Sequence, residues 1–200
     1  MKHAVNHLKK SDPVLGAIIR GIGAYSMEQR DPVFATLVRS IVFQQVSTAV
    51  ARIIYGRVEK SMPSGVTPEA VLRKRATTLR KLGLSQQKPE YIRDLARHTK
   101  SGTVDFAALS NLSDEQVIET LTQVKGIGVW TAQMFLMFAL ARPNVLPTGD
   151  FGIRKAMQIA YKLNELPKPQ VMEEIAKPWR PYCSVASWYL WRSLDGIAGI

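Results

Sequence analysis

The residues best placed to do chemistry lie between Leu121 and Leu140, in the segment LTQVKGIGVWTAQMFLMFAL. Its centre, Gly126-Ile127-Gly128, separates an amphipathic stretch from a strongly apolar one, which is the pattern of a helix-hairpin-helix. Two glycines let the backbone turn tightly and approach a phosphate, and the second helix directs its N–H groups and positive dipole end at that phosphate. Lys125 adds a positive charge. The alternative is a plain helical hairpin.

A second candidate is Asp150, which follows Leu146-Pro147-Thr148-Gly149 and opens an expected helix from Phe151 to Leu163. An aspartate at this position usually caps the helix. A carboxylate can also stabilise positive charge on a reacting centre and orient or deprotonate a water molecule. One side chain can do both, so the sequence leaves both interpretations open.

The charge balance favours a polyanionic partner. Lys plus Arg total 27 and Asp plus Glu total 16, giving a formal net charge of +11. Each neutralised phosphate releases counterions, so nucleic acid is the first candidate. Secreted basic proteins and proteins that bind anionic membranes share this excess, and charge alone does not decide among them.

Cysteine and histidine usage argues against metal chemistry. The single cysteine, Cys183, excludes an intrachain disulfide and a four-cysteine zinc or iron–sulfur site. His3, His7 and His98 do not have metal-ligand spacing. No stretch approaches ~18 apolar residues, and the N-terminus lacks an apolar signal core. We therefore expect no metal in the chemistry, no membrane partner, and a location in the cytoplasm or nucleoid of a prokaryote or the nucleus of a eukaryote.

The elements that must position these residues are helices. Nearly every segment has a helical period, which predicts an all-α fold of about ten short helices. Asp12-Pro13 and Asp31-Pro32 have the form of an N-cap followed by a first-turn proline, opening helices from Pro13 to Ile22 and from Pro32 to Phe43. Further helix starts are predicted at Thr67 and at Ser113, which has capping-box spacing to Gln116.

The hairpin, the Gly/Pro-containing loop and Asp150 together resemble, over Val124 to Ala160, the signature of the helix-hairpin-helix DNA glycosylase superfamily with its Gly/Pro-rich loop and Asp. Within it the chain is most similar to the 3-methyladenine DNA glycosylase II family. The resemblance runs from about Asp31, through SIVFQQVSTAVA (Ser40 to Ala51), to KPWRPYCSVASWYLWR (Lys177 to Arg192). It implies an enzyme that starts base excision repair by flipping alkylated purines, such as 3-methyladenine and 7-methylguanine, out of duplex DNA and hydrolysing their N-glycosidic bond.

The resemblance places Asp150 at the family's catalytic position. N-alkylation puts a positive charge on the purine, so its departure needs little help from a general acid and one carboxylate suffices. Thr148 and Gly149 depart from a second acidic residue that some relatives carry. Relatives that nick the strand use a lysine two residues after the second hairpin glycine, and that position is Trp130 here. The implied enzyme is therefore monofunctional.

The same resemblance implies a substrate pocket. Trp130 and Trp188 match aromatic positions where a flipped, electron-deficient base stacks, and Phe43 is expected beside them. Met134 replaces an aromatic found in some relatives, which leaves the substrate range open. Both tryptophans lie in apolar helices, so the alternative is that they are core residues.

Further residues are assigned to DNA. Gln45 matches the position whose side chain fills the gap left by the flipped base, and Gln44 lies beside it. The alternative is that both glutamines only satisfy loop backbone. The expected DNA-binding residues are Gln44, Gln45, Lys125, Gly126, Ile127, Gly128 and Thr131.

No cofactor is expected to be required. Hairpins of this family can hold a monovalent cation, Na⁺ or K⁺, on backbone carbonyls, which here would be those of Thr122, Val124 and Ile127. We expect a monomer with duplex DNA as its partner. We also expect one compact domain over residues 1–200, with a lobe at 31–144, a second lobe from 1–30 plus 145–200, and a DNA cleft between them.

The main rival of another class is a non-catalytic helix-hairpin-helix DNA-binding module, in which Asp150 only caps a helix. An endonuclease-III-like or adenine-mismatch glycosylase is a rival among enzymes. The single cysteine argues against its cluster-bearing forms, and Trp130 argues against its lyase forms.

Overall fold

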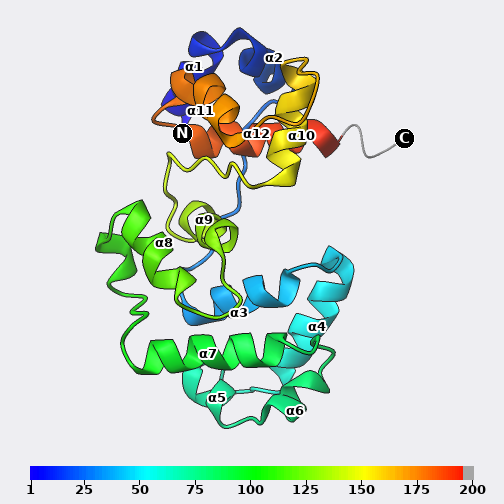
Figure 1. Ribbon diagram of the computed structural model, residues 1–200, viewed down its shortest axis with the longest axis vertical. Coiled ribbons are helices and arrows are strands. Elements are labelled where there is room, and N and C mark those ends of the chain that lie inside the picture. Colours follow the sequence, from blue (N-terminus) through cyan, green and yellow to red (C-terminus); the bar gives the residue numbers. More distant parts are fainter. Residues whose placement is uncertain (196–200) are drawn as a thin grey trace. The chain divides into compact units, whose positions relative to one another are not determined.

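The computed structural model describes residues 1–195, and all regular secondary structure within them is helical (Figure 1). Twelve α-helices and two 3-10 helices are present in this part of the chain, where about ten helices were predicted. The all-α prediction is confirmed. The chain divides into two compact units, the first made of Met1–Gln29 with Ala141–Ile200 and the second of Arg30–Leu140.

Unit 1 gathers the two ends of the chain around one apolar core. Its helices are α1 (Lys2–Ser11), α2 (Pro13–Ile22), α10 (Phe151–Ala160), α11 (Pro169–Ala176), the 3-10 helix η2 (Lys177–Trp179) and α12 (Cys183–Asp195). The core holds Leu8, Leu15, Met157 and Trp179, all fully buried. Because α12 contacts α2 and α10, segments from both ends of the chain share this core.

A buried carboxylate connects three parts of unit 1. Asp12 caps α2, with its Oδ1 accepting the N–H groups of Val14 at 2.9 Å and Leu15 at 3.0 Å. Its Oδ2 accepts the Tyr161 hydroxyl at 2.6 Å and the Trp179 indole N–H at 2.7 Å. The predicted cap is confirmed, and it also fixes residues far along the chain.

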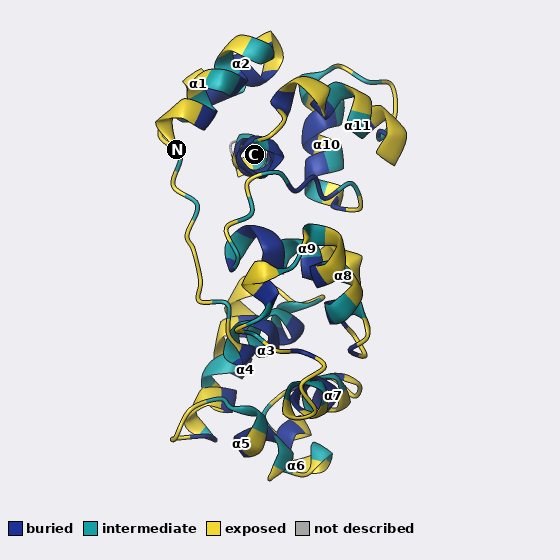
Figure 2. Ribbon diagram, turned by 90° about the vertical axis from the view of Figure 1, so that its left-hand side faces the viewer, coloured by how far each residue is buried: buried dark blue, intermediate teal, exposed yellow. Residues whose placement is uncertain are grey.

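Unit 2 is built around one central helix. Its elements are α3 (Phe34–Phe43), α4 (Thr48–Lys60), α5 (Pro68–Leu72), α6 (Ala76–Arg80), α7 (Lys88–Lys100), the 3-10 helix η1 (Leu109–Asn111), α8 (Asp114–Thr122) and α9 (Val129–Phe138). α7 contacts α3, α5 and α6. Figure 2 shows buried stretches on α3, α7 and α9, which include Leu37, Ile92 and Phe135.

The predicted helix starts are mostly confirmed. Thr67 caps α5 through the N–H of Ala70, and Ser113 and Gln116 form a capping box at the start of α8. The prediction at Asp31 is wrong, because α3 begins at Phe34 with Val33 as its N-cap. The backbone carbonyl of Asp31 instead accepts the N–H of Val33 and the hydroxyl of Thr36.

No helix within residues 1–195 is long and apolar enough to cross a membrane.

Candidate functional site

The hairpin in unit 2 has the predicted order of helix, glycine turn and helix. α8 ends at Thr122 and α9 begins at Val129, with Gly128 as an N-cap that has no side-chain cap bond. Lys125, Gly126, Gly128 and Trp130 are exposed, whereas the Ile127 side chain is buried. The N-terminal end of α9 therefore opens on an exposed strip where the backbone can meet an anion.

The two hairpin glycines are needed for different reasons. Gly126 has a φ of 82°, and a Cβ added there would lie 2.2 Å from the ring of Tyr91. Gly128 has an extended backbone, with a φ of −96°, and no heavy atom lies within 4 Å of its would-be Cβ. The fold therefore favours glycine at 126, whereas no contact within the protein requires glycine at 128.

A hydrogen bond connects α7 to the hairpin. The buried Asp94 accepts the backbone N–H of Lys125 through Oδ2 at 2.9 Å, and its Oδ1 accepts the guanidinium of Arg97 at 2.9 Å. Burial disfavours the ionised carboxylate, but these two donors outweigh it and lower the pKa of Asp94. Sequence reasoning missed Tyr91 and Asp94, because nothing in their local spacing distinguishes them from other residues of an amphipathic helix.

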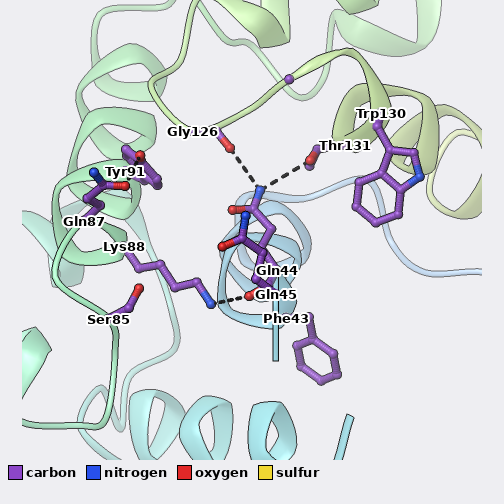
Figure 3. Close-up of a pocket in the computed structure, with 11 residues that line it drawn as sticks. Phe43, Gln44, Gln45, Ser85, Gln87, Lys88, Tyr91, Gly126, Trp130 and Thr131 are labelled. Atoms are coloured by element: carbon purple, nitrogen blue, oxygen red, sulfur yellow. Dashed lines mark hydrogen bonds between the residues drawn. The ribbon is translucent and has the colours of Figure 1, made fainter. Parts of the chain in front are cut away.

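The Gln44–Gln45 turn, defined as these two residues after α3, contacts the hairpin directly. The Gln44 amide donates to the carbonyl of Gly126 at 2.9 Å and to the hydroxyl of Thr131 at 3.3 Å (Figure 3). Gln45 has a φ of 56° and an exposed side chain. Thr131 is buried, so its side chain holds Gln44 in place.

Two adjoining hollows lie on unit 2. One, of about 430 Å³, is lined by the Gln44–Gln45 turn, Lys88, Tyr91, Gly126, Trp130 and Thr131 (Figure 3). The other, of about 300 Å³, brings together three of the predicted pocket residues, Phe43, Trp130 and Met134. Trp130 is 42% exposed, which leaves ring surface for a partner.

Three arginines that sequence reasoning did not single out line the second hollow, namely Arg30, Arg39 and Arg52. The guanidinium carbon of Arg39 lies 3.9 Å from the centre of the Phe43 ring. Burial, together with the nearby charges of Arg30 and Arg52, lowers the pKa of Arg39. This face is therefore positively charged as well as aromatic.

Trp188 belongs to unit 1 and lines neither of these two hollows. Its ring makes T-shaped contacts with Tyr25, at 4.9 Å between centroids, and with Tyr189, at 4.8 Å. It is 8% exposed and belongs to the core of unit 1. The structure thus favours the core interpretation over the predicted stacking role, because neighbouring aromatic rings occupy its surface.

Asp150 is the N-cap of α10, as predicted, and its carboxylate is held by two donors. Oδ1 accepts the N–H of Ile153 at 2.8 Å and the indole N–H of Trp191 at 2.9 Å. A Cβ on Gly152 would lie 3.1 Å from this oxygen and 3.1 Å from the Trp191 ring. The glycine therefore allows the indole to reach the carboxylate. Asp150 is 8% exposed, so it is a buried, oriented group.

The carbonyl ligands predicted for a monovalent cation lie at the end of α8 (Thr122) and in the turn after it (Val124 and Ile127). The Val124 carbonyl already accepts the N–H of Ile127 at 3.1 Å, which leaves its second lone pair for a cation. Among residues 1–195 no cluster of His, Cys, Asp or Glu side chains has the geometry of a metal site.

Comparison with known proteins places this geometry in a family. A family pattern described as "HhH-GPD superfamily base excision DNA repair protein" matches residues 38–181. DNA-3-methyladenine glycosylase 1 of Schizosaccharomyces pombe is 31% identical over 194 residues, covering 94% of this chain and 85% of that protein.

Two solved structures are similar over nearly the whole chain. DNA-3-methyladenine glycosidase from Bacillus halodurans is 38% identical with a TM-score of 0.87, covering 98% of this chain and 90% of that one. The 3-methyladenine DNA glycosylase of S. pombe, solved in complex with abasic DNA, is 30% identical with a TM-score of 0.86, covering 96% and 97%. The chain belongs to the HhH-GPD superfamily of base excision DNA repair proteins.

Proposed function

We propose that this protein is a DNA glycosylase that starts base excision repair by hydrolysing the N-glycosidic bond of alkylated purines in duplex DNA. The observation that carries the proposal is Asp150, a buried carboxylate held in one orientation by Ile153 and Trp191. The names of the relatives, DNA-3-methyladenine glycosylases, support the alkylated-purine substrate.

The chemistry needs little more than such a group. As the glycosidic bond breaks, the sugar gains oxocarbenium character, and a fixed carboxylate stabilises that positive charge. The same group can accept a proton from the attacking water. An N-alkylated purine leaves as a neutral base, so no second acid is required. Fixed orientation matters because the carboxylate then does not have to reorganise during the reaction.

Unit 2 supplies the DNA-binding groups of the proposal. The N-terminal end of α9 and the charge of Lys125 would bind the phosphate backbone, which positions the enzyme without reading sequence. Phe43, Trp130 and Met134 would receive the flipped base, and Gln45 would fill the space that the base leaves.

We further propose that the enzyme does not cut the strand, since Trp130 stands where strand-nicking relatives carry lysine. Three further points stay predictions. No cofactor is required, the protein is a monomer, and a monovalent cation binds the carbonyls of Thr122, Val124 and Ile127.

The test is a base-release assay on methylated duplex DNA with the full chain, a chelator present and no metal added. Free methylpurine and alkali-independent strand breaks are followed together. Asp150→Asn is expected to lower release by about 100-fold or more while binding persists, because the carboxylate acts mainly in the transition state. Asp195→Asn is the matched control, since Asp195 forms an exposed ion pair with Arg192.

Each other outcome has a defined meaning. Full activity of Asp150→Asn contradicts the catalytic assignment. No release by the unaltered protein, together with DNA binding, points to the non-catalytic module. Strand breaks, with a covalent adduct trapped by borohydride, contradict the monofunctional proposal and direct attention to the exposed Lys125.

A further inference from the structure

Lys88 is a buried lysine whose ammonium group is bonded to backbone carbonyls. It is the first residue of α7, is 7% exposed, and its Nζ donates to the backbone carbonyls of Val42 at 2.9 Å and Gln44 at 2.6 Å. No carboxylate among residues 1–195 lies within ion-pair distance of its Nζ. Burial lowers the pKa of its ammonium group, because taking the charged group out of water costs free energy.

The carbonyls that Lys88 contacts explain its position. Both belong to the C-terminal end of α3, where carbonyl groups lack helical partners and the helix dipole is negative. A cation that donates to them satisfies these groups and complements the dipole. The contact joins residues 46 positions apart in the sequence, so it fixes tertiary structure.

The backbone next to these carbonyls is strained. Gln45 directly follows the Gln44 carbonyl and has a φ of 56°, a conformation that costs free energy for a residue other than glycine. Surrounding contacts must hold such a conformation. The Gln44 amide is held from the hairpin side by Gly126 and Thr131, and the Gln44 carbonyl is held from the α7 side by Lys88 (Figure 3).

We propose that Lys88 is a positioning residue that holds Gln45 in the conformation needed to enter the DNA stack when a base is flipped. This inference rests on the proposed function. Lys88 itself remains beneath the turn, bonded to the carbonyls, and does not contact the reacting atoms. Lys88 lines the same hollow as Gly126 and Trp130.

The first measurement reports insertion without requiring excision. A duplex carries a tetrahydrofuran abasic analogue opposite 2-aminopurine, whose fluorescence changes as its stacking is disturbed. The unaltered protein is expected to change the fluorescence, and Lys88→Met and Gln45→Ala are each expected to lose that change. Lys60→Met, at an exposed lysine of α4, is the matched control. An unaltered response in Lys88→Met overturns the proposal whatever the enzyme excises.

The second measurement is the single-turnover excision rate of 7-methylguanine in two duplexes, one with the lesion paired and one with it in a single-nucleotide bulge. Misplacing a group in the site can cost about 100-fold in rate, and we expect this loss for Lys88→Met on the paired duplex. On the bulge the loss is expected to be much smaller, because an unpaired base needs less help to leave the stack. Equal slowing on both duplexes means that Lys88 only stabilises the fold, and overturns the proposal.

A double variant separates the remaining explanations. If Lys88 acts through Gln45, Lys88→Met combined with Gln45→Ala is no slower than Gln45→Ala alone. Additive rate losses in the double variant contradict the proposal. So does weaker binding of Lys88→Met to undamaged duplex with a reduced salt dependence, because that result would make Lys88 a phosphate contact. If Lys88→Met does not fold, Lys88→Gln replaces it, because its amide can donate to one of the two carbonyls.

Discussion

The indole N–H of Trp191 donates to Asp150 Oδ1 across 2.9 Å, joining residues that lie 41 positions apart in the sequence. The contact lies within unit 1 and is accompanied by a glycine at 152, where a side chain would crowd both groups. A carboxylate at a helix N-terminus needs only backbone donors to act as a cap. The additional side-chain donor fixes its orientation, which a cap alone does not require.

Replacing Trp191 by Phe is therefore expected to slow base excision while leaving DNA binding unchanged. A hydrogen bond to a charged group contributes about 1.5–3 kcal/mol. If that contribution is lost in the transition state, the excision rate falls about tenfold to 100-fold. The measurement is the single-turnover rate at saturating enzyme, with the dissociation constant for undamaged duplex as a control. A change in the dissociation constant alone would mean that Trp191 serves binding rather than orientation.

Asp12→Ala is expected to destabilise unit 1 far more than an ordinary lost cap. The substitution leaves the Tyr161 hydroxyl and the Trp179 indole N–H without the Asp12 carboxylate, and each unsatisfied buried donor costs about 1–3 kcal/mol. Ser47→Ala, which removes the side-chain cap of α4, is the control and should cost about 1 kcal/mol. Urea unfolding curves compare the two variants. Equal losses would show that the two aromatic partners add nothing.

The parts of this site that could be predicted from the sequence depend on local backbone rules. Gly126, the capping box at Ser113 and the cap at Asp150 occur where turns and helix starts restrict residue type. Asp31 has the same local form as Asp12, yet it does not cap, because α3 begins three residues after it. Local form thus indicates a helix start without fixing its position.

The residues that sequence reasoning missed act over long separations. Asp94 reaches Lys125 across 31 positions, and Lys88 reaches Val42 across 46. Each is one polar residue on a helix whose spacing is ordinary, and its role exists only after the helices pack. For the same reason the sequence could not decide whether Trp188 stacks on a ligand or fills the core.

The free energy of unfolding is expected to fall at alkaline pH, because buried tyrosine and cysteine side chains of unit 1 ionise. Burial raises the pKa of Tyr25 to about 12 and that of Cys183 to about 11, and burial with the nearby Asp12 raises the pKa of Tyr161. Groups whose pKa is higher in the folded protein contribute stability that is complete below the unfolded value and is lost as pH rises. The loss should begin near pH 9, the ordinary value for Cys183, and steepen above pH 10, the ordinary value for tyrosine.

Urea midpoints followed by tryptophan fluorescence between pH 8 and pH 11 measure this loss. Tyr161→Phe should be less stable at pH 8, since it lacks the bond to Asp12, yet should lose less stability over the alkaline range. Lys88 and Arg39 in unit 2 have lowered pKa values and therefore contribute the opposite slope. A Tyr161→Phe variant with an unchanged pH slope would contradict the assignment.

Alanine at the two hairpin glycines should separate folding from DNA contact. At Gly126 a side chain would clash with the Tyr91 ring, and the φ of 82° is unfavourable for any residue with a Cβ. Gly126→Ala is therefore expected to lower the free energy of unfolding by at least about 1–3 kcal/mol.

At Gly128 a Cβ would contact nothing and the backbone is extended, so Gly128→Ala should fold with unchanged stability. Any loss of DNA affinity in Gly128→Ala then reports obstruction of the phosphate, and it should be the same for all duplex sequences because backbone contacts carry no sequence information. Urea unfolding and titration of several undamaged duplexes measure the two effects, and a Gly128→Ala variant that binds every duplex normally would place the phosphate contact elsewhere.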